Sequence, residues 1–371
     1  MKSSRRPIIL VGGGSGGHIF PLLAVAEELQ ARQIPFVFIG SASGKEKSIV
    51  ESQKWPFRAI SAGKWRRHFS LASFAQNIID IFRFIWGFFQ SLALLISVRP
   101  LAVFSKGGFV ALPVCLAAKL LGVRLIVHES DSVMGLTNRI CSRFAHKVLV
   151  AFDPEMYPTH SPRYIQVGVP MKRNLRQAAK LPTPKKSRPL IVVIAGIQGS
   201  QFINQMVREN LVGLLKEADI IHSTGDTDYL PHKALGAKLP PALRSAYKPM
   251  SFIGRELAYY YQAADLVISR ASMTVICEAA LFSKSLYLIP LPSAAADHQT
   301  KNALILESAG AAVASRQQSL TREQFLHDIV GLLHTPEKLS SMAGALRGDF
   351  NENDSIEIII NLLTDGKTEG E

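Results

Sequence analysis

A glycine-rich segment near the N-terminus combines residues that could bind an anion with one that could move a proton. Val11–His18 holds five glycines between the apolar run Ile8–Val11, typical of a buried strand, and a helical pattern over Pro21–Leu29. Glycines let the backbone approach a ligand, and helix N-terminal amides attract anions. His18 adds an imidazole, which titrates near neutral pH, beside this predicted phosphate site. We weigh His18 equally as a catalytic base and as a structural residue.

Dinucleotide-binding loops share this glycine pattern. They also carry an acidic residue at the end of the second strand, where it binds a ribose. Here the predicted second strand, Phe36–Ile39, continues into Gly40-Ser-Ala-Ser. The sequence therefore disfavours a dinucleotide site.

Two further turns in the first half carry polar residues after apolar runs. The predicted strand Leu101–Phe104 leads into the glycine loop Ser105–Pro113, which opens a helix and suits a second anion. The predicted strand Leu125–Val127 leads into His128-Glu-Ser-Asp131. Because parallel sheets bind ligands at the carboxyl ends of their strands, we expect both turns to face a ligand.

The second half repeats this design. Leu190–Ile194 is a predicted strand followed by a turn into a helix, and Leu266–Ser269 leads into a segment that ends at Glu278. We expect Ser272 or Thr274 to cap that helix, its amides to hold a diphosphate and Glu278 to accept ribose hydroxyls. The alternative is an exposed glutamate that the helix dipole stabilises. Ala296–Asn302 opens another helix, either to bind sugar hydroxyls or simply capped at Asp297.

The elements that position these residues alternate between strand and helix, which predicts an α/β fold with doubly wound parallel sheets. Proline- and lysine-rich sequence interrupts the alternation at 169–188 and marks a linker. We therefore predict two Rossmann-like domains, 1–168 and 189–350, with a C-terminal helix at about 352–363 that packs back on the first. A further strand is predicted at Met250–Ile253 and a short helix at Tyr259–Ala264.

The overall charge restricts the partners. With 371 residues, a formal net charge of +13 implies an acidic partner: a nucleic acid, an anionic membrane or a phosphorylated substrate. We exclude nucleic acid because the chain lacks zinc-ligand spacing, RNP-like patterns and a basic helix with interleaved aromatics. Cys115, Cys141 and Cys277 have no ligand spacing and are predicted to be reduced core thiols. The N-terminus lacks the pattern of a signal peptide.

The most apolar stretch is Phe74–Val98. A spanning helix needs roughly 20 uninterrupted apolar residues, and only fifteen lie between Arg83 and Arg99. A buried core helix explains the C-terminal half, but the aromatic half is apolar on all sides. We therefore prefer a patch that lies on a membrane surface, with basic residues beside it. Its predicted members are Phe82, Ile85, Trp86, Phe88, Phe89, Arg66 and Arg67, with Lys64 and Arg83 nearby.

Taken together, these segments resemble the MurG family, whose members are GT-B glycosyltransferases that move N-acetylglucosamine (GlcNAc) from UDP-GlcNAc onto lipid I to give lipid II. The order and spacing of the matching segments carry the resemblance, which covers nearly the whole chain. They are Gly13–His18 with Pro21, Lys106–Phe109, His128-Glu129 with Gly135–Asn138, Gly168–Pro170, Gly196–Ser200 with Asn204, Ser269–Ser272 with Glu278, and His298-Gln299 with Asn302.

The resemblance implies a GT-B fold of two Rossmann-like domains facing across a cleft, with specific roles for matched residues. The implied donor-binding residues are Ser15, Gly16, Gly17, Asp131, Lys172, Ile197, Ile253, Met273, Thr274, Val275, Ile276, Cys277, Glu278 and Gln299. Within this set, Ile253 would contact uracil through its backbone and Gln299 the acetamido sugar. The implied acceptor-diphosphate residues are Gly14, Lys106, Gly107 and Gly108, together with His18. The apolar patch matches the family's membrane-docking surface, which implies a peripheral location on the cytoplasmic face of the cell membrane.

Four positions depart from the family pattern. Ile197 replaces a serine that contacts the nucleotide, Lys172 an arginine, Asp131 an asparagine and Met273 a small residue. These changes put donor affinity and donor identity in question more than the fold. Lysine, for example, lacks the bidentate geometry of arginine.

The implied reaction is an inverting displacement without a metal, in which His18 is the candidate base. No cofactor is expected, because helix N-termini can stabilise the leaving diphosphate. The implied partners are UDP-GlcNAc, lipid I, an anionic membrane surface and other cell-wall enzymes. Three rival functions stay open: a related GT-B enzyme with another lipid acceptor, a UDP-GlcNAc 2-epimerase, and a non-catalytic paralogue that binds nucleotide sugars.

Overall fold

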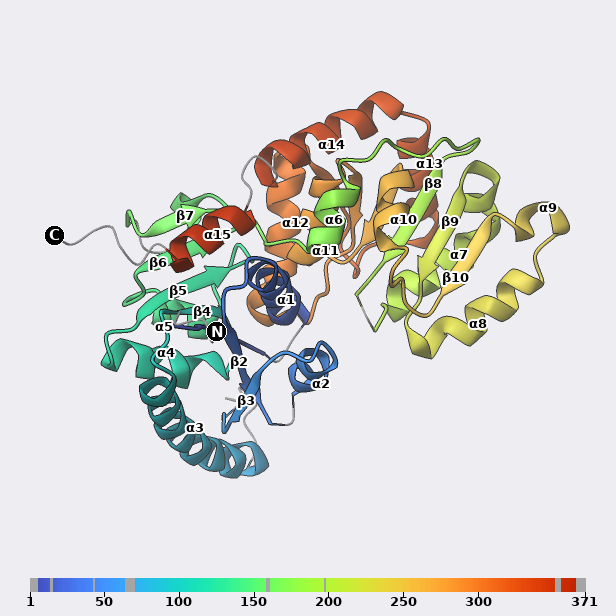
Figure 1. Cartoon of the computed structure of the whole chain (residues 1–371). Coiled ribbons are helices and arrows are strands. Elements are labelled where there is room, and N and C mark those ends of the chain that lie inside the picture. Colours follow the sequence, from blue (N-terminus) through green and yellow to red (C-terminus); the bar gives the residue numbers. More distant parts are fainter. Residues whose placement is uncertain are drawn as a thin grey trace. The chain divides into compact units, whose positions relative to one another are not determined.

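The structure is a computed structural model that describes residues 6–13, 16–42, 44–63, 71–157, 161–196, 198–350 and 355–364. The chain forms two compact units (Figure 1). Unit 1 comprises Met1–Arg173 and Asn353–Glu371, and unit 2 comprises Asn174–Glu352. Each unit is built on its own sheet, in which every strand pair listed below is parallel.

Unit 1 contains a seven-stranded sheet with the order β3-β2-β1-β4-β5-β6-β7. Ile8 of β1 pairs with Phe36 of β2 on one side and with Ala102 of β4 on the other. The strand order therefore reverses at β1, and ligands of doubly wound sheets bind at such a point. The strands are β1 (Ile8–Gly12), β2 (Phe36–Ser41), β3 (Phe57–Ile60), β4 (Ala102–Gly107), β5 (Arg124–Glu129), β6 (Lys147–Val150) and β7 (Tyr164–Gln166).

Helices connect these strands. Pro21, predicted to lie in the first helical turn, is instead the sixth residue of α1, which already begins at Gly16. Proline has no amide hydrogen, so Pro21 cannot make the bond to the carbonyl of Gly17. The helix loses only this one bond of its first turns, because the first four amides of any helix have no partner within the helix. The helices of unit 1 are α1 (Gly16–Ala31), α2 (Lys45–Ser52), α3 (Leu71–Val98), α4 (Ala111–Leu120), α5 (Leu136–Cys141), the 3₁₀ turn η1 (Pro154–Met156) and α15 (Ser355–Thr364).

Unit 2 contains a six-stranded sheet with the order β10-β9-β8-β11-β12-β13. Its order reverses between β8 and β11, which pair directly. The turns after these two strands are therefore neighbours at one edge of the sheet. The strands are β8 (Leu190–Ile194), β9 (Asp219–Ser223), β10 (Tyr247–Met250), β11 (Leu266–Ser269), β12 (Ser285–Leu288) and β13 (Ala312–Ala314).

The helices of unit 2 are more numerous than the sequence analysis predicted, since it named none at α8, α9, α13 or α14. They are α6 (Arg173–Ala178), α7 (Gln201–Glu217), α8 (Asp226–Ala237), α9 (Pro241–Arg244), α10 (Leu257–Ala263), α11 (Met273–Leu281), η2 (Ala295–Asp297), α12 (His298–Ser308), α13 (Arg322–Leu333) and α14 (Pro336–Phe350).

The predicted strand Met250–Ile253 is wrong by three residues, because β10 covers Tyr247–Met250. Pro249 disguised the true position, since proline cannot donate to a ladder. It is accommodated here because β10 is the edge strand.

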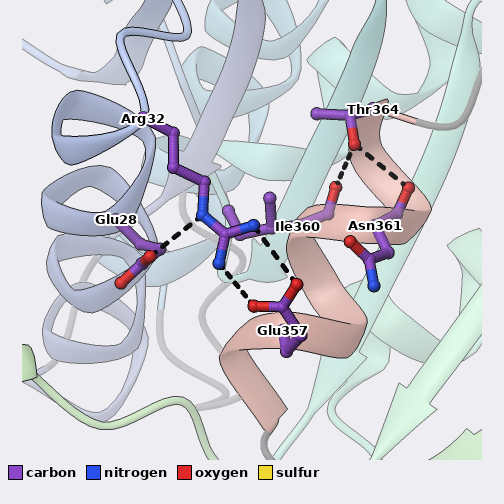
Figure 2. Close-up of polar contacts among 6 residues, drawn as sticks. All are labelled: Glu28, Arg32, Glu357, Ile360, Asn361 and Thr364. Atoms are coloured by element: carbon purple, nitrogen blue, oxygen red, sulfur yellow. Dashed lines mark hydrogen bonds and ion pairs between the residues drawn. The ribbon is translucent and has the colours of Figure 1, made fainter.

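The C-terminal helix α15 completes the core of unit 1. Ile356, Ile359, Ile360 and Leu363 are at most 1% exposed and pack in one cluster with residues of β1 and α1. Figure 2 shows the polar contacts of α15 with the end of α1. Arg32, which directly follows α1, donates through Nε to Glu28 (2.9 Å) and pairs with both carboxylate oxygens of Glu357. Hydrogen bonds to Glu357 and Glu28 raise the pKa of Arg32 above its ordinary value.

Candidate active site

His18, the third residue of α1, lies against the turn after β4. His18 Nδ1 lies 2.9 Å from the carbonyl oxygen of Gly13, so this nitrogen carries the proton and Nε2 is the basic one. Gly108 has φ +85°, and a Cβ there would lie 2.4 Å from that same oxygen and 3.2 Å from His18 Nδ1. Only glycine therefore allows the two turns to meet closely around the imidazole.

The surroundings of His18 keep its imidazole neutral. Burial lowers its pKa from the ordinary 6.5, and the positive charge of Lys106 lowers the pKa further. The Gly13 carbonyl, Glu129 and Asp131 act in the opposite direction, but burial and Lys106 prevail. A neutral imidazole is the form that can accept a proton.

Lys106 lies inside unit 1. It is 1% exposed, and its ammonium donates to the hydroxyl of Ser130 over 2.6 Å. β4 also extends to Gly107, so Lys106 is a strand residue and not part of a loop, as the predicted loop Ser105–Pro113 had it. A buried ammonium needs a hydrogen-bond partner, which the β5 turn supplies through Ser130.

Glu129 organises the turn after β5. Its carboxylate accepts from the amides of Asp131 (3.1 Å) and Gly135 (2.9 Å) and from Nδ2 of Asn138 (2.9 Å). Asp131 is predicted to bind the sugar-nucleotide donor. Its backbone carbonyl accepts a hydrogen bond from the hydroxyl of Tyr157 over 3.0 Å. His128 and Glu129 lie within β5 and are buried, whereas the sequence analysis placed them beyond the strand. The polar character of these residues concealed the end of the strand.

In unit 2, the turn after β11 presents the start of α11. Ser272 occupies the N-cap position but makes no side-chain capping bond, which corrects the predicted cap. Met273, Val275, Ile276 and Cys277 are buried, and Thr274 is half-buried. The amide of Ile276 already donates to the Ser272 carbonyl over 3.1 Å, so the first-turn amides, at Met273, Thr274 and Val275, are the ones that a ligand could meet.

Glu278 lies one turn further along α11 and is half-buried. Its Oε2 accepts a hydrogen bond from the hydroxyl of Tyr261 over 2.8 Å. Burial raises the pKa of Tyr261 well above its ordinary value, and the negative charge of Glu278 raises the pKa further. Tyr261, which the sequence analysis missed, therefore stays protonated and orients the carboxylate.

The start of α12 is strained and not capped as predicted. Ala296 and Asp297 both have φ near +55°, and the Asp297 side chain makes no capping bond. Gln299 points back toward the end of β12, where its Oε1 accepts from the amide of Leu291 over 3.0 Å. Ile253 follows β10 and is 3% exposed.

Comparison with known proteins assigns this arrangement. The models for the glycosyltransferase family 28 N-terminal and C-terminal domains match residues 8–150 and 190–357. A Clostridium kluyveri protein named UDP-N-acetylglucosamine--N-acetylmuramyl-(pentapeptide) pyrophosphoryl-undecaprenol N-acetylglucosamine transferase is 35% identical, over 86% of this chain and 89% of its own. The chain belongs to the MurG family.

Other members agree with this assignment. A protein of the same name from Lachnoclostridium phytofermentans is 32% identical, over 96% of this chain and 98% of its own. The crystal structure of Acinetobacter baumannii MurG has a TM-score of 0.76 at 27% identity, over 96% of this chain and 99% of that one. The predicted α/β class with two parallel-sheet domains is confirmed.

The long helix α3 of this MurG-family chain is packed with its polar side inward. Asp80, Gly87, Ser91 and Leu95 form its buried stripe, and α4 packs along it. The outward side carries apolar residues that are at least 42% exposed. They are Ile78, Ile79, Ile81, Phe82, Ile85, Trp86, Phe89 and Ile96.

Phe88 differs from its predicted neighbours in this patch, because it is half-buried and packs edge-on against Phe89. By length and composition alone, Gln76–Val98 could cross a membrane. A helix that crossed a membrane would lose the contacts of its buried stripe with the rest of unit 1. The packing therefore favours a helix that stays on its domain.

Several predicted site residues of this MurG-family chain lie outside the described residues, namely Gly14, Ser15, Ile197, Arg66 and Arg67. Gly16 and Gly17 open α1, and the ammonium of Lys172 lies 5.7 Å from the centroid of the Phe20 ring. Within the described part of the chain, no three His, Cys, Asp or Glu residues form a group that could hold a metal ion.

Proposed function

We propose that this enzyme transfers GlcNAc from UDP-GlcNAc to the MurNAc-pentapeptide carried on undecaprenyl diphosphate, lipid I, and so forms lipid II for peptidoglycan synthesis. The observation that carries the proposal is the 35% identity to a relative named for this activity over 89% of that relative's length. The two sites described above supply a neutral base in unit 1 and a helix N-terminus with a carboxylate in unit 2.

In the reaction we assign the base to His18. Its Nε2 accepts the proton of the acceptor's C4 hydroxyl as that oxygen attacks the anomeric carbon of GlcNAc. The bond from that carbon to the UDP oxygen breaks, the configuration inverts and UDP leaves with the electron pair. The lowered pKa of His18 supports this role, because the imidazole is neutral at the pH of the reaction.

We assign donor binding mainly to unit 2. The first-turn amides of α11, at Met273, Thr274 and Val275, hold the diphosphate, and the helix dipole favours its charge. Ile276 and Cys277 line the same donor site. Glu278 accepts the ribose hydroxyls, the backbone of Ile253 contacts uracil, and Gln299 contacts the acetamido sugar.

Residues of unit 1 complete the assignment. Ser15, Gly16, Gly17, Asp131 and Lys172 contact the donor, together with Ile197 of unit 2. Gly14, Gly107 and Gly108 bind the acceptor diphosphate through their backbones. The burial of Lys106 supports an electrostatic contribution to the same site, because its charge acts there over a short distance.

The apolar side of α3 supports a peripheral position on an anionic membrane surface at the cytoplasmic face. Phe82 is 68% exposed and Trp86 62% exposed, which is unusual for neighbouring large apolar residues on one helix. Aromatic residues favour the interface between lipid and water, and the net charge of +13 favours anionic lipids. A lipid-linked acceptor would be met at this surface.

The test is transfer of labelled GlcNAc from UDP-GlcNAc to a short-chain lipid I analogue, with UDP release followed in parallel. We expect UDP release that depends on the acceptor and a labelled disaccharide product. Release of UDP without acceptor dependence, or saturable donor binding without transfer, would contradict the proposed acceptor.

A further inference from the structure

A buried polar cluster in unit 2 links four elements beneath the turn after β8. It consists of His222 on β9, Asn204 on α7, Tyr247 on β10, and Asp228 and His232 on α8. His222 is 0% exposed, and Asn204 and His232 are each 2% exposed. Burying this many polar groups is costly unless each is hydrogen-bonded, so the arrangement of their bonds is informative.

The bonds of Asn204 fix its orientation. Its Nδ2 lies 2.8 Å from the carbonyl oxygen of Thr224 and 2.7 Å from a carboxylate oxygen of Asp228. Both partners can only accept when Asp228 is ionised, so the amide nitrogen points at them and Oδ1 points the other way. Oδ1 then requires a donor, and Nε2 of His222 lies 3.0 Å from it.

The orientation of Asn204 determines the direction of the other hydrogen bonds in the cluster. With its proton on Nε2, neutral His222 has an accepting Nδ1, which lies 3.0 Å from the hydroxyl of Tyr247. Tyr247 therefore donates to His222, and its oxygen accepts from Nδ1 of His232 over 2.7 Å. Every hydrogen bond has one direction, and one tautomer of His222 satisfies them all. Burial lowers the pKa of His222 well below its ordinary value, in agreement with a neutral ring.

The carbonyl that Asn204 holds supports the glycine turn between β8 and α7. Gly199 in that turn has φ +72°, and a Cβ there would lie 2.0 Å from the Thr224 oxygen. The turn Ser223–Gly225 is fixed from its other side by the Thr224 amide and hydroxyl, which donate to Met250 over 2.9 and 3.1 Å. The glycine turn thus rests directly on a carbonyl whose position depends on Asn204.

The turn after β8 lies where this sheet should bind its ligand. β8 and β11 are adjacent, and the strand order reverses between them. The start of α11, to which we assign the diphosphate, follows β11 at the same edge. A small shift of the β8 turn would therefore disturb nucleotide binding.

We propose that His222 is a positioning residue for the sugar-nucleotide donor, acting through Asn204 and the Thr224 carbonyl on the turn residues Gln198–Ser200. This inference rests on the proposed function, which supplies the donor. His222 itself does not touch substrate. Its part is to donate from Nε2 and so keep the Asn204 amide facing Thr224.

The test compares three substitutions in the purified full-length enzyme. His222→Leu removes the N–H that donates to Asn204, and His222→Gln restores an N–H at a similar reach. Tyr247→Phe leaves that N–H in place and removes both hydrogen bonds of the Tyr247 hydroxyl, to His222 and from His232. We expect the KM for UDP-GlcNAc and the Kd for UDP to rise about tenfold in His222→Leu, the cost of one buried unsatisfied group. The KM for the lipid I analogue and kcat should change less than twofold.

The controls separate positioning from general damage. We expect His222→Gln to keep the donor KM within about threefold of wild type, and Tyr247→Phe to leave it nearly unchanged despite a lower melting temperature. If His222→Leu does not fold, His222→Gln and Tyr247→Phe still test the proposal. A purely structural role predicts that donor affinity falls in proportion to the melting temperature in these two variants.

Equal donor affinity in wild type and His222→Leu would overturn the proposal, as would a loss in all three variants in proportion to their stability. Calorimetric binding of UDP, measured without acceptor, keeps this result apart from the proposed transfer. Weakened UDP binding in His222→Leu would support the positioning role even if wild type failed to make lipid II. Unchanged binding would refute that role even if transfer were normal.

Discussion

Both units place a strand–turn–helix motif at the centre of a parallel sheet, yet the described side chains around the two motifs differ in kind. In unit 1, His18 is half-buried near Lys106 and Glu129, so the site contains ionisable groups that set one another's charge. In unit 2, the first residues of α11 are mostly apolar and buried, and the carboxylate of Glu278 follows one turn later. The difference teaches that the same architecture can carry interacting ionisable groups at one turn and a largely apolar helix start at the other.

The largest effect should come from removing the base in unit 1. We expect His18→Ala to lower kcat by about 10²–10³-fold with little change in the donor KM, since a positioned general base contributes on this scale. Steady-state kinetics with UDP-GlcNAc and a lipid I analogue measure both values. Near-normal turnover in a folded variant would show that His18 is not the base and would contradict the proposed difference between the units.

A variant in unit 2 should have the opposite effect, raising the donor KM more than it lowers kcat. We expect Glu278→Gln to raise the donor KM by about 10–30-fold with a smaller effect on kcat, because ribose hydroxyls lose a charged acceptor. Tyr261→Phe is the matched control, since it keeps the carboxylate and removes only its 2.8 Å hydrogen bond, and it should cost a few-fold. A kcat loss without a KM change would give Glu278 a different role.

Membrane binding should also be confined to unit 1. We expect Trp86→Ser to weaken partitioning onto phosphatidylglycerol vesicles by about tenfold, the loss of one large apolar side chain from the interface. Leu230→Ser in α8 of unit 2 is the control, because Leu230 is 70% exposed but belongs to no described apolar helix face. Equal losses in sedimentation assays would show that binding does not depend on α3.

The pH profile tests how the charges in unit 1 cooperate. Because the pKa of His18 is lowered from 6.5, the neutral base is present at pH 7, and kcat/KM should fall only as the pH drops through that lowered pKa. Lys106→Met removes a cause of the lowering, so the acid limb should move to higher pH. A limb that does not move would mean that another group controls it.

The smallest effect concerns the anchoring of α15. Arg32 and Glu357 are 33% and 47% exposed, so solvent screens their pairing, and a double-mutant cycle of Arg32→Gln with Glu357→Gln should give a coupling of about 0.5 kcal/mol. Hydrogen exchange should place the loss in unit 1 alone. Faster exchange in unit 2 would show that the two units are coupled in stability.

The sequence was informative wherever one element determines its own structure. Apolar runs such as Leu190–Ile194 and Leu266–Ser269 predicted buried strands, and the alternation of strands with helices predicted the parallel architecture. The ends of β4 at Gly107 and of β5 at Glu129 were hidden, because a buried charged residue such as Lys106 or Glu129 looks like a loop residue until its partners are known. Those partners, Ser130 and Asn138, come from other elements.

Contacts from distant elements could not be predicted for the same reason. The cluster around His222 draws its members from four elements of unit 2, and Tyr261 reaches Glu278 from α10. Periodicity records which face of a helix is buried, but not which polar atom meets it. The roles of the individual site residues remain predictions.

The return of α15 to unit 1 has a consequence for the order of synthesis. The chain emerges from the ribosome N-terminus first, yet the core of unit 1 includes Ile356, Ile359, Ile360 and Leu363 from the last helix. Unit 2 is synthesised in full before α15, so its core can form while the core of unit 1 still lacks these side chains. A nascent chain stopped before Ser355 would therefore leave the earlier-made unit with an open apolar face, and that unit would be the one to recruit chaperones.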